Sequence, residues 1–97
     1  MTIGSLTARL LIRESRSLKD KRQVVRSILD RVKGGFNVSA TEIESHDDVK
    51  VAVLGFAIVA AESEAARGVL NQIAEALRKH PIAECLGCEI ATGHEVV

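Results

Sequence analysis

Residues 14–33 read ESRSLKDKRQVVRSILDRVK, and this stretch contains the start, the buried face and the charge of one amphipathic helix. Ser17 is placed to cap the first turn, and Asp20, three positions later, completes a capping-box pattern. Gly34-Gly35 is typical of a helix end closed by a left-handed glycine. Apolar residues at helical spacing predict a buried stripe of Leu18, Val25, Ile28, Leu29 and Val32.

Positive charge is concentrated in the same region. Residues 13–33 contain eight Lys or Arg and three Asp or Glu, whereas the whole chain has 13 basic and 13 acidic residues. Such a concentration of cations in a neutral protein favours an anionic partner, for example RNA. The alternative is an ordinary solvated helix face. The candidate anion- or RNA-binding residues are Arg13, Arg16, Lys19, Arg22, Arg26 and Lys33.

The segments before and after this helix have the pattern of strands. Residues 3–13 alternate between apolar and polar side chains, as in a half-buried strand. Residues 36–44 alternate as well, until Ile43 breaks the phase and predicts either a bulge or a strand that runs past the core. Residues 46–48, His-Asp-Asp, are typical of a turn.

The second half repeats this order. Residues 49–60 are predicted to form a strand that is apolar on both faces. A second helix is predicted over residues 63–80, capped by Ser63 and stopped by Pro81. Residues 83–97 are predicted to form the last strand and a tail.

This element order predicts an α+β fold of the ferredoxin-like βαββαβ type, in which two helices cover one face of a four-stranded antiparallel sheet. Residues 1–97 are predicted to form a single domain. The other face of the sheet would be open to water, although the third strand is apolar there. We therefore expect a homodimer packed sheet to sheet, with the interface candidates Val49, Val51, Val53 and Val59.

Composition narrows the classes of function. The only aromatic residues are Phe36 and Phe56, which argues against stacking of RNA bases on the sheet. No secretory signal is visible, and the longest apolar stretch, residues 51–61, is too short to span a bilayer. We expect a cytoplasmic protein without a membrane partner, in which the two cysteines are free thiols.

Three motifs carry a family resemblance: ESRSLKDKR at residues 14–22, FNVS at 36–39 and AVLG at 52–55. With them the chain resembles the YlxP-like family of small bacterial proteins of unknown function. The resemblance implies a ferredoxin-like fold and dimerisation. Genes of this family often lie beside those for translation initiation factor two and ribosome-binding factor A, which implies a link to ribosome maturation or translation. Many members have Trp-Gln-Arg where this chain has Val-Lys-Val at residues 49–51, and the family brings no established catalytic residues.

Cys85 and Cys88 form a CxxC motif that, with His80 and His94, offers four ligands suited to zinc. Residues three apart on a strand point to opposite faces, so both sulfurs converge only if Gly87 breaks the strand. The alternative is two small apolar residues in or near the core.

Two further candidates have similar alternatives. Glu42, Glu44 and His46 have the spacing to share one strand face and hold a divalent cation, but a polar edge strand has the same pattern. Lys21 lies beside the buried stripe, and we expect its stem over apolar surface with its amine in water or against a carboxylate. A catalytic lysine would need burial and a lowered pKa.

Three functions remain. The first is a non-enzymatic accessory protein, without a cofactor, that contacts ribosomal RNA or a ribosome assembly intermediate through the basic helix. The second is a regulatory or scaffold homodimer that binds an acidic protein or a small anion. The third is a metal-dependent enzyme.

Overall fold

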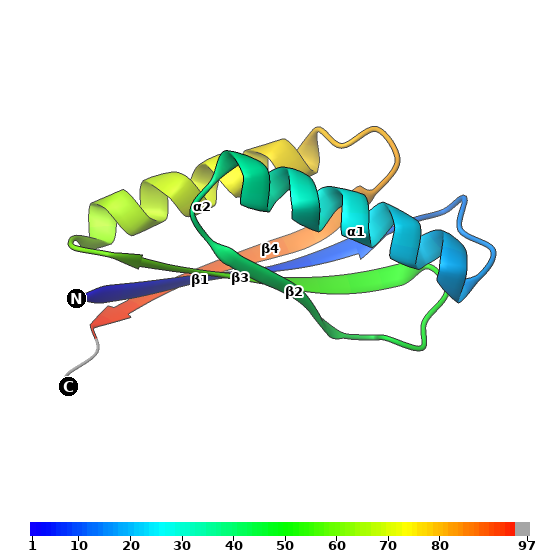
Figure 1. Ribbon diagram of the computed structural model, residues 1–97, viewed down its shortest axis with the longest axis horizontal. Helices are drawn as coiled ribbons and strands as arrows, with labels where there is room; N and C mark the ends of the chain where they lie inside the picture. Colours follow the sequence, from blue (N-terminus) through cyan, green and yellow to red (C-terminus); the bar gives the residue numbers. More distant parts are fainter. Residues whose placement is uncertain (95–97) are drawn as a thin grey trace.

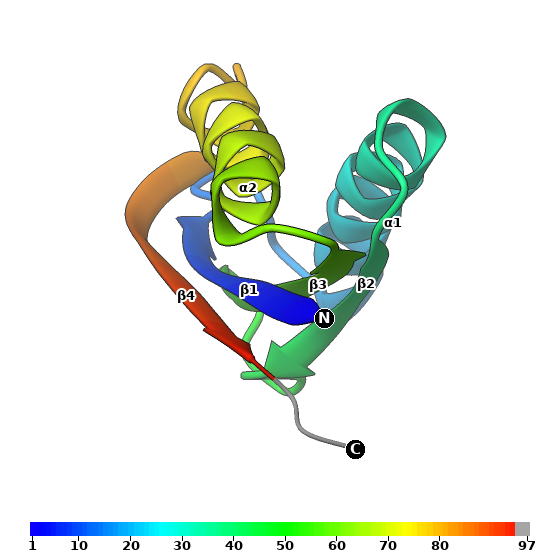
Figure 2. The same ribbon diagram turned by 90° about the vertical axis from the view of Figure 1, so that its left-hand side faces the viewer.

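The computed structural model describes residues 1–94, which form an antiparallel sheet in the order β2-β3-β1-β4 and two helices. Both helices lie on one face of the sheet, with α2 over β1, β3 and β4 and α1 towards the β2 edge (Figures 1 and 2). The predicted α+β, ferredoxin-like fold is confirmed. Its elements are β1 (Thr2–Leu11), α1 (Leu18–Gly35), β2 (Ser39–Glu44), β3 (Val51–Ala60), α2 (Ser63–Arg78) and β4 (Glu84–His94).

The core lies between the sheet and the helices, and it is aliphatic apart from Phe56 and the partly buried Phe36. Strand alternation supplies the sheet side, since Leu6, Ala8 and Leu10 of β1 point to the helices and stand beside inward-facing residues of β3. Helical spacing supplies the other side. The buried apolar helix residues are Val25, Ile28 and Val32 of α1 and Ala66, Leu70, Ile73, Ala74 and Leu77 of α2.

The start of α1 has the predicted cap, and its end differs from the prediction. Ser17 Oγ accepts a hydrogen bond from the backbone N–H of Asp20 at 3.0 Å. The prediction of a left-handed glycine was wrong, because Gly34 and Gly35 lie within α1 and neither has a positive φ. The helix ends instead at Phe36, whose backbone is extended and whose side chain packs against the core, so that the chain turns directly into β2.

The ends of α2 also differ from the prediction. Ser63 lies inside the helix, and the preceding Glu62 occupies the cap position without a side-chain hydrogen bond. The helix ends at Arg78, before His80, because the His80 ring takes part in the following turn. Its Nδ1 accepts hydrogen bonds from the backbone N–H groups of Ile82 and Ala83, at 3.2 and 3.0 Å.

Two bulges change which side chains share a face. Of the two alternatives predicted at Ile43, the bulge is confirmed, because the pairing of β2 with β3 shifts between Glu42 and Glu44. Ile43 then lies over Gly55, where an added Cβ atom would come within 2.9 Å of its methyl group, so a larger residue at this position would have to displace Ile43. The second bulge is in β4, where the pairing partner of Arg9 is Gly87 and that of Leu10 is Cys85, which leaves an extra residue between them.

The face of the sheet opposite the helices is uncovered (Figure 2). Its residues are mostly small or polar, but Ile3, Ile43 and Val59 are exposed there, Val59 to 65%. Val53 is buried even in the single chain, with 2% of its surface exposed. Its cross-strand neighbours are Arg9 and Glu44, whose long side chains can cover it. Val51 is partly buried on the same face.

Val49 is not part of this open face. It precedes β3, and its carbonyl accepts a hydrogen bond from Ser15 Oγ at 2.6 Å. β3 begins at Val51, two residues later than predicted, because residues 45–50 form a loop against the turn after β1. Of the four interface candidates, Val51, Val53 and Val59 therefore lie on the open face.

Candidate functional site

The motif residues before and within the first turn of α1 build a rigid corner. Ser15 is buried, and its hydroxyl lies within hydrogen-bond distance of two carbonyls, 2.6 Å from that of Val49 and 3.1 Å from that of Ser17. Asp20 Oδ2 accepts from the backbone N–H of Arg16 at 3.0 Å, so the carboxylate closes the turn from the other side. The SLKDKR motif is thus largely explained by local structure.

Lys21 lies at the centre of this corner with no exposed surface. Its Nζ donates to the carbonyl oxygens of Ser45 and Val51, at 2.7 and 3.1 Å, and forms an ion pair with Glu42 Oε2 at 3.1 Å. Of the two predicted environments for the amine, water or a carboxylate, the structure shows the carboxylate. The ammonium has two carbonyl acceptors and an adjacent carboxylate that opposes its charge, which accounts for its burial.

The loop between β2 and β3 completes the corner. Asp48 Oδ1 accepts from the backbone N–H groups of Lys50 and Val51, both at 2.8 Å. These hydrogen bonds hold the pKa of the Asp48 carboxyl below its usual value of 3.8. Lys50 Nζ donates to the carbonyls of Arg13 and Ser15 at 2.6 and 2.8 Å, so the loop is fixed to the turn after β1.

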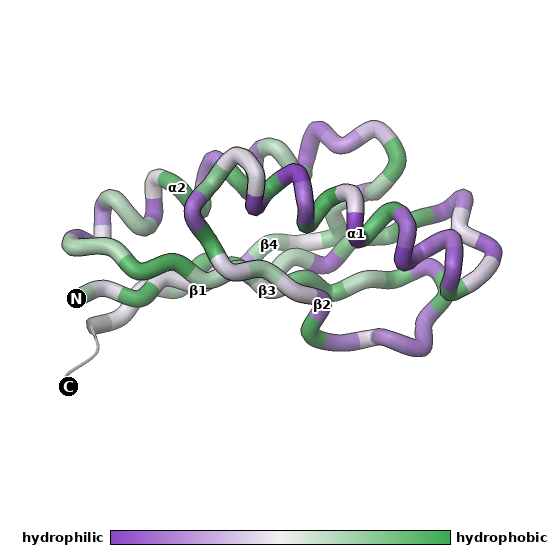
Figure 3. Tube along the Cα trace, in the orientation of Figure 1, coloured by the Kyte–Doolittle hydropathy of each residue, from purple (hydrophilic) through white to green (hydrophobic). Residues whose placement is uncertain are grey.

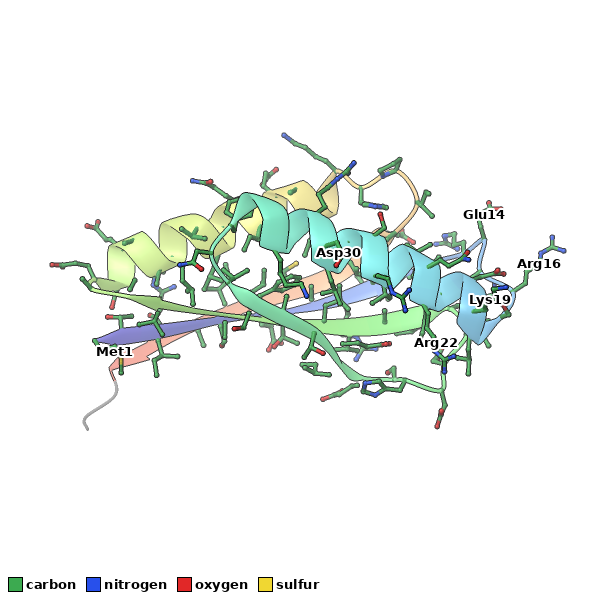
Figure 4. The ribbon with its side chains drawn as sticks, in the orientation of Figure 1. Met1, Glu14, Arg16, Lys19, Arg22 and Asp30 are labelled. Carbon is green, nitrogen blue, oxygen red and sulfur yellow. The ribbon has the colours of Figure 1, made fainter. Side chains whose placement is uncertain are left out.

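Arg31 lies on the flank of α1 opposite to Arg22 and Arg26, because successive helix residues are about 100° apart. Five other cations lie on the remaining surface, one just before the helix cap and four along the helix. They are exposed, and none of them forms an ion pair with another residue in the described part of the chain. Figure 4 shows Arg16 in the turn before α1 and Lys19 and Arg22 on its first turns, at the end of the molecule where hydrophilic residues gather in Figure 3. We call Arg16, Lys19, Arg22, Arg26 and Lys33 the α1 cationic surface.

Part of this surface lines an open groove of about 470 Å³ between α1 and the β2 edge of the sheet. Arg22, Arg26 and Lys33 line it from the helix, and His46 lines it from the β2–β3 loop. Asp30 and Glu42 also line it, and Glu42 is the partner of Lys21. The cations therefore outnumber the carboxylates that are free to oppose them.

Arg13 lies apart from the α1 cationic surface. Its Nη2 donates to Glu84 Oε2 at 2.8 Å, at the opposite edge of the sheet. There it lines a second pocket, of about 600 Å³, together with Arg78, His80 and Cys85. The sequence predicted that Arg13 belongs to the same cationic patch as the helix residues. In the structure Arg13 follows β1 and lies beside β4, whereas α1 lies towards the β2 edge of the sheet.

The zinc candidates are only partly brought together. Cys85 Sγ and Cys88 Sγ are 3.2 Å apart, because the bulge in β4 turns both cysteines to the helix-covered face. The expectation that a broken strand was needed is wrong, since the bulge suffices. His80 uses Nδ1 for two backbone hydrogen bonds, and the side chain of His94 lies outside the described part of the structure. Within residues 1–94, no group of three or more His, Cys, Asp or Glu residues is placed to hold a metal ion.

The acidic candidates separate as well. Glu42 points inwards to Lys21, whereas Glu44 pairs across the bulge with Val53 on the open face. His46 Nε2 lies 3.1 Å from the carbonyl oxygen of Glu42. The bulge at Ile43 therefore prevents a shared cation site. Sequence reasoning missed the Lys21–Glu42 pair, although a lysine on the buried stripe and a bulge after Glu42 were both signals of it.

The structure defines a small ferredoxin-like protein with an exposed cationic helix on a hydrogen-bonded corner. The chain belongs to a family described as protein of unknown function (DUF503), whose profile matches residues 3–90. No curated protein matches this chain. Within residues 1–94, neither helix is long and apolar enough to cross a membrane.

Two designed proteins of solved structure share the fold. The de novo designed protein Foldit4 superimposes with a TM-score of 0.56 at 17% identity, covering 99% of this chain and 100% of that one. The de novo designed protein LFR1 1 with ferredoxin fold gives a TM-score of 0.52 at 20% identity, covering 100% of this chain and 88% of that one. At these identities the likeness concerns the fold alone.

Proposed function

We propose that this chain is a non-catalytic, cytoplasmic accessory protein that contacts RNA backbone through the α1 cationic surface. The observation that carries the proposal is a set of five exposed cations along α1 and just before it, in a protein with no net charge. None of the five has an ion-pair partner among residues 1–94. Neutralising phosphates releases condensed counterions, so such a surface has a ready source of binding free energy.

Contact with phosphates agrees better with this chain than contact with bases. Sequence-specific recognition of single-stranded RNA commonly stacks bases on exposed aromatic side chains. The two aromatic residues of the chain, Phe36 and Phe56, both pack in the core between sheet and helices. We therefore propose that the protein recognises the backbone of structured RNA.

Ribosomal RNA or a ribosome assembly intermediate is the proposed target. This part rests on the resemblance to YlxP-like proteins, through the motif residues of the corner and the strands, and on the gene setting that the resemblance implies. A ribosomal particle also presents the structured phosphate surface that a helix without aromatic residues can use.

A charge-reversal pair tests the proposal. Arg22→Glu with Arg26→Glu should abolish co-sedimentation with ribosomal particles at moderate salt. Arg31→Glu with Arg67→Glu is the matched control, because it makes the same change in net charge at exposed positions outside the α1 cationic surface. Co-sedimentation that is equal in both variants would contradict the proposal.

A scaffold homodimer is the second candidate, and the open face of the sheet favours it. Ile3, Ile43 and Val59 are exposed there, and Arg9 and Glu89 line a pocket on the same face. Two copies packed face to face would cover the apolar residues and bring opposite charges together. Such a dimer would carry the α1 cationic surface twice, and its ligand would then be an acidic protein or a small anion.

A further inference from the structure

Two thiols meet on the helix-covered side of β4. Cys85 and Cys88 are both half-buried, both pack against the core, and their Sγ atoms share an S–H···S contact of 3.2 Å. The extra residue of the β4 bulge, Leu86, brings them to the same face. Neither cysteine has any part in the proposed RNA contact.

Little movement is needed to join these sulfurs. A disulfide bond is about 2.05 Å long, so each Sγ must move by roughly half an ångström. β4 is an edge strand that pairs with β1 alone, and a Cβ atom added at Gly87 would have no neighbour within 4 Å. The backbone between the two cysteines therefore has room to adjust.

We propose that Cys85 and Cys88 form a dithiol redox site, which a small peptide disulfide such as glutathione disulfide oxidises reversibly to an intrachain disulfide. A metal centre explains the pair less well, because no third ligand joins it within residues 1–94. The site also has an entrance. Cys85 lines the pocket of about 600 Å³ together with Arg13 and Arg78. Their guanidinium groups form exposed ion pairs with Glu84 and Glu75, which a carboxylate of the peptide disulfide can replace.

The two cysteines have different roles in this exchange. Cys85 lines the pocket through which the disulfide approaches and Cys88 does not, so Cys85 supplies the attacking sulfur. Burial and the contact with Cys85 raise the pKa of the Cys88 thiol to about 11, which agrees with Cys88 keeping its proton at this stage. Cys85 Sγ displaces one glutathione thiolate and forms a mixed disulfide. That thiolate takes the Cys88 proton, and Cys88 Sγ then displaces the second glutathione, which leaves as a thiolate and is protonated by water. One disulfide is consumed, one is formed, and two thiols are released.

The test uses the full, reduced chain and glutathione disulfide. After incubation, the protein is quenched in acid, unfolded, treated with a maleimide and weighed by intact mass spectrometry. We expect the loss of two hydrogens and no maleimide on either cysteine, with both thiols restored by dithiothreitol. Two maleimides on the oxidant-treated protein, a lasting glutathione adduct, or a disulfide between two chains would each overturn the proposal.

Single substitutions separate the roles. Cys88→Ser should stop at one glutathione on residue 85, because the second displacement is lost. Cys85→Ser should form its glutathione adduct more slowly than Cys88→Ser does at the same pH. Equal rates in the two variants would contradict the assigned order, and circular dichroism on each variant checks that both are folded.

Discussion

Lys21 joins α1 to the β2–β3 segment through one buried ammonium group. Its partners are the carbonyls of Ser45 and Val51 and the carboxylate of Glu42, all distant in the sequence. Ser45 has a positive φ of 62°, which is uncommon for a residue with a side chain. The hydrogen bond from Lys21 to its carbonyl helps to hold that conformation.

Replacing Lys21 by Met should therefore destabilise the fold. The substitution keeps the apolar stem but leaves Glu42 without its partner and two carbonyls without a donor. Because the Glu42 side chain is 14% exposed, we expect a loss of about 3 kcal/mol, at the lower end of the range for a broken buried ion pair. Urea unfolding measures it. The double variant Lys21→Met, Glu42→Gln should be more stable than Lys21→Met alone, and a loss below about 1 kcal/mol in the single variant would contradict this role.

His80 should make stability depend on pH. Burial and, to a lesser extent, the charge of Arg31 lower its pKa below the usual value of 6.5. As the pH falls below about 7, His80 is therefore protonated in the unfolded chain before it is protonated in the folded chain. The contribution of neutral His80 to the free energy of unfolding is complete above about pH 7, and it is lost as the pH falls through the folded-state pKa. Protonation of Nδ1 would also remove the acceptor for Ile82 and Ala83. The difference in free energy of unfolding between the natural chain and His80→Ala should decrease as the pH is lowered from 7. A difference that stays constant would contradict the role assigned to His80.

α1 is an element with two uses. Its inner side, with Val25, Ile28 and Val32, packs on the sheet, while its outer side presents the α1 cationic surface. The corner around Ser17 and Lys21 fixes where this helix begins, and so fixes the positions of the cations. The capping hydrogen bond should accordingly be a measurable part of helix stability.

α1 has a side-chain cap at its first turn and α2 has none. Replacing the serine near the start of each helix tests this difference. Ser17→Ala removes the hydrogen bond to the Asp20 N–H and should cost about 1 kcal/mol. Ser63 makes no capping hydrogen bond in α2, so Ser63→Ala should change stability by less than about 0.5 kcal/mol. Thermal and urea unfolding of both variants decide the point. Equal losses would mean that the cap assignment is incorrect.

The order of elements, the cap at Ser17 and the bulge at Ile43 were predictable from the sequence, because each depends on neighbouring residues. The ends of the helices were less predictable, since Phe36 and His80 end them through tertiary packing and turn contacts. The contact between Cys85 and Cys88 depends on a register shift against Arg9 and Leu10 of β1. Local spacing contains no information on that shift. For the same reason the separation of Arg13 from the α1 cationic surface was not predicted.

On the scale of the whole molecule, the proposed dimer depends on the open face. Two copies would hide Ile3 and Val59, which are neighbours across β1 and β3. Val59→Glu places a charge at the most exposed large apolar side chain of that face, at 65% exposure. It should convert a dimer at micromolar concentration into a folded monomer, measured by light scattering. A monomer already in the natural chain would contradict the dimer.

The central claim is that the α1 cationic surface binds RNA backbone. Its most direct measurement is the salt dependence of binding to purified ribosomal particles, for the natural chain, Arg22→Glu with Arg26→Glu, and the control Arg31→Glu with Arg67→Glu. Loss of two phosphate contacts should reduce the slope of log K against log salt by about 2, together with a large loss of affinity, in the first variant alone. Binding whose affinity and salt slope are the same in all three proteins would contradict the claim.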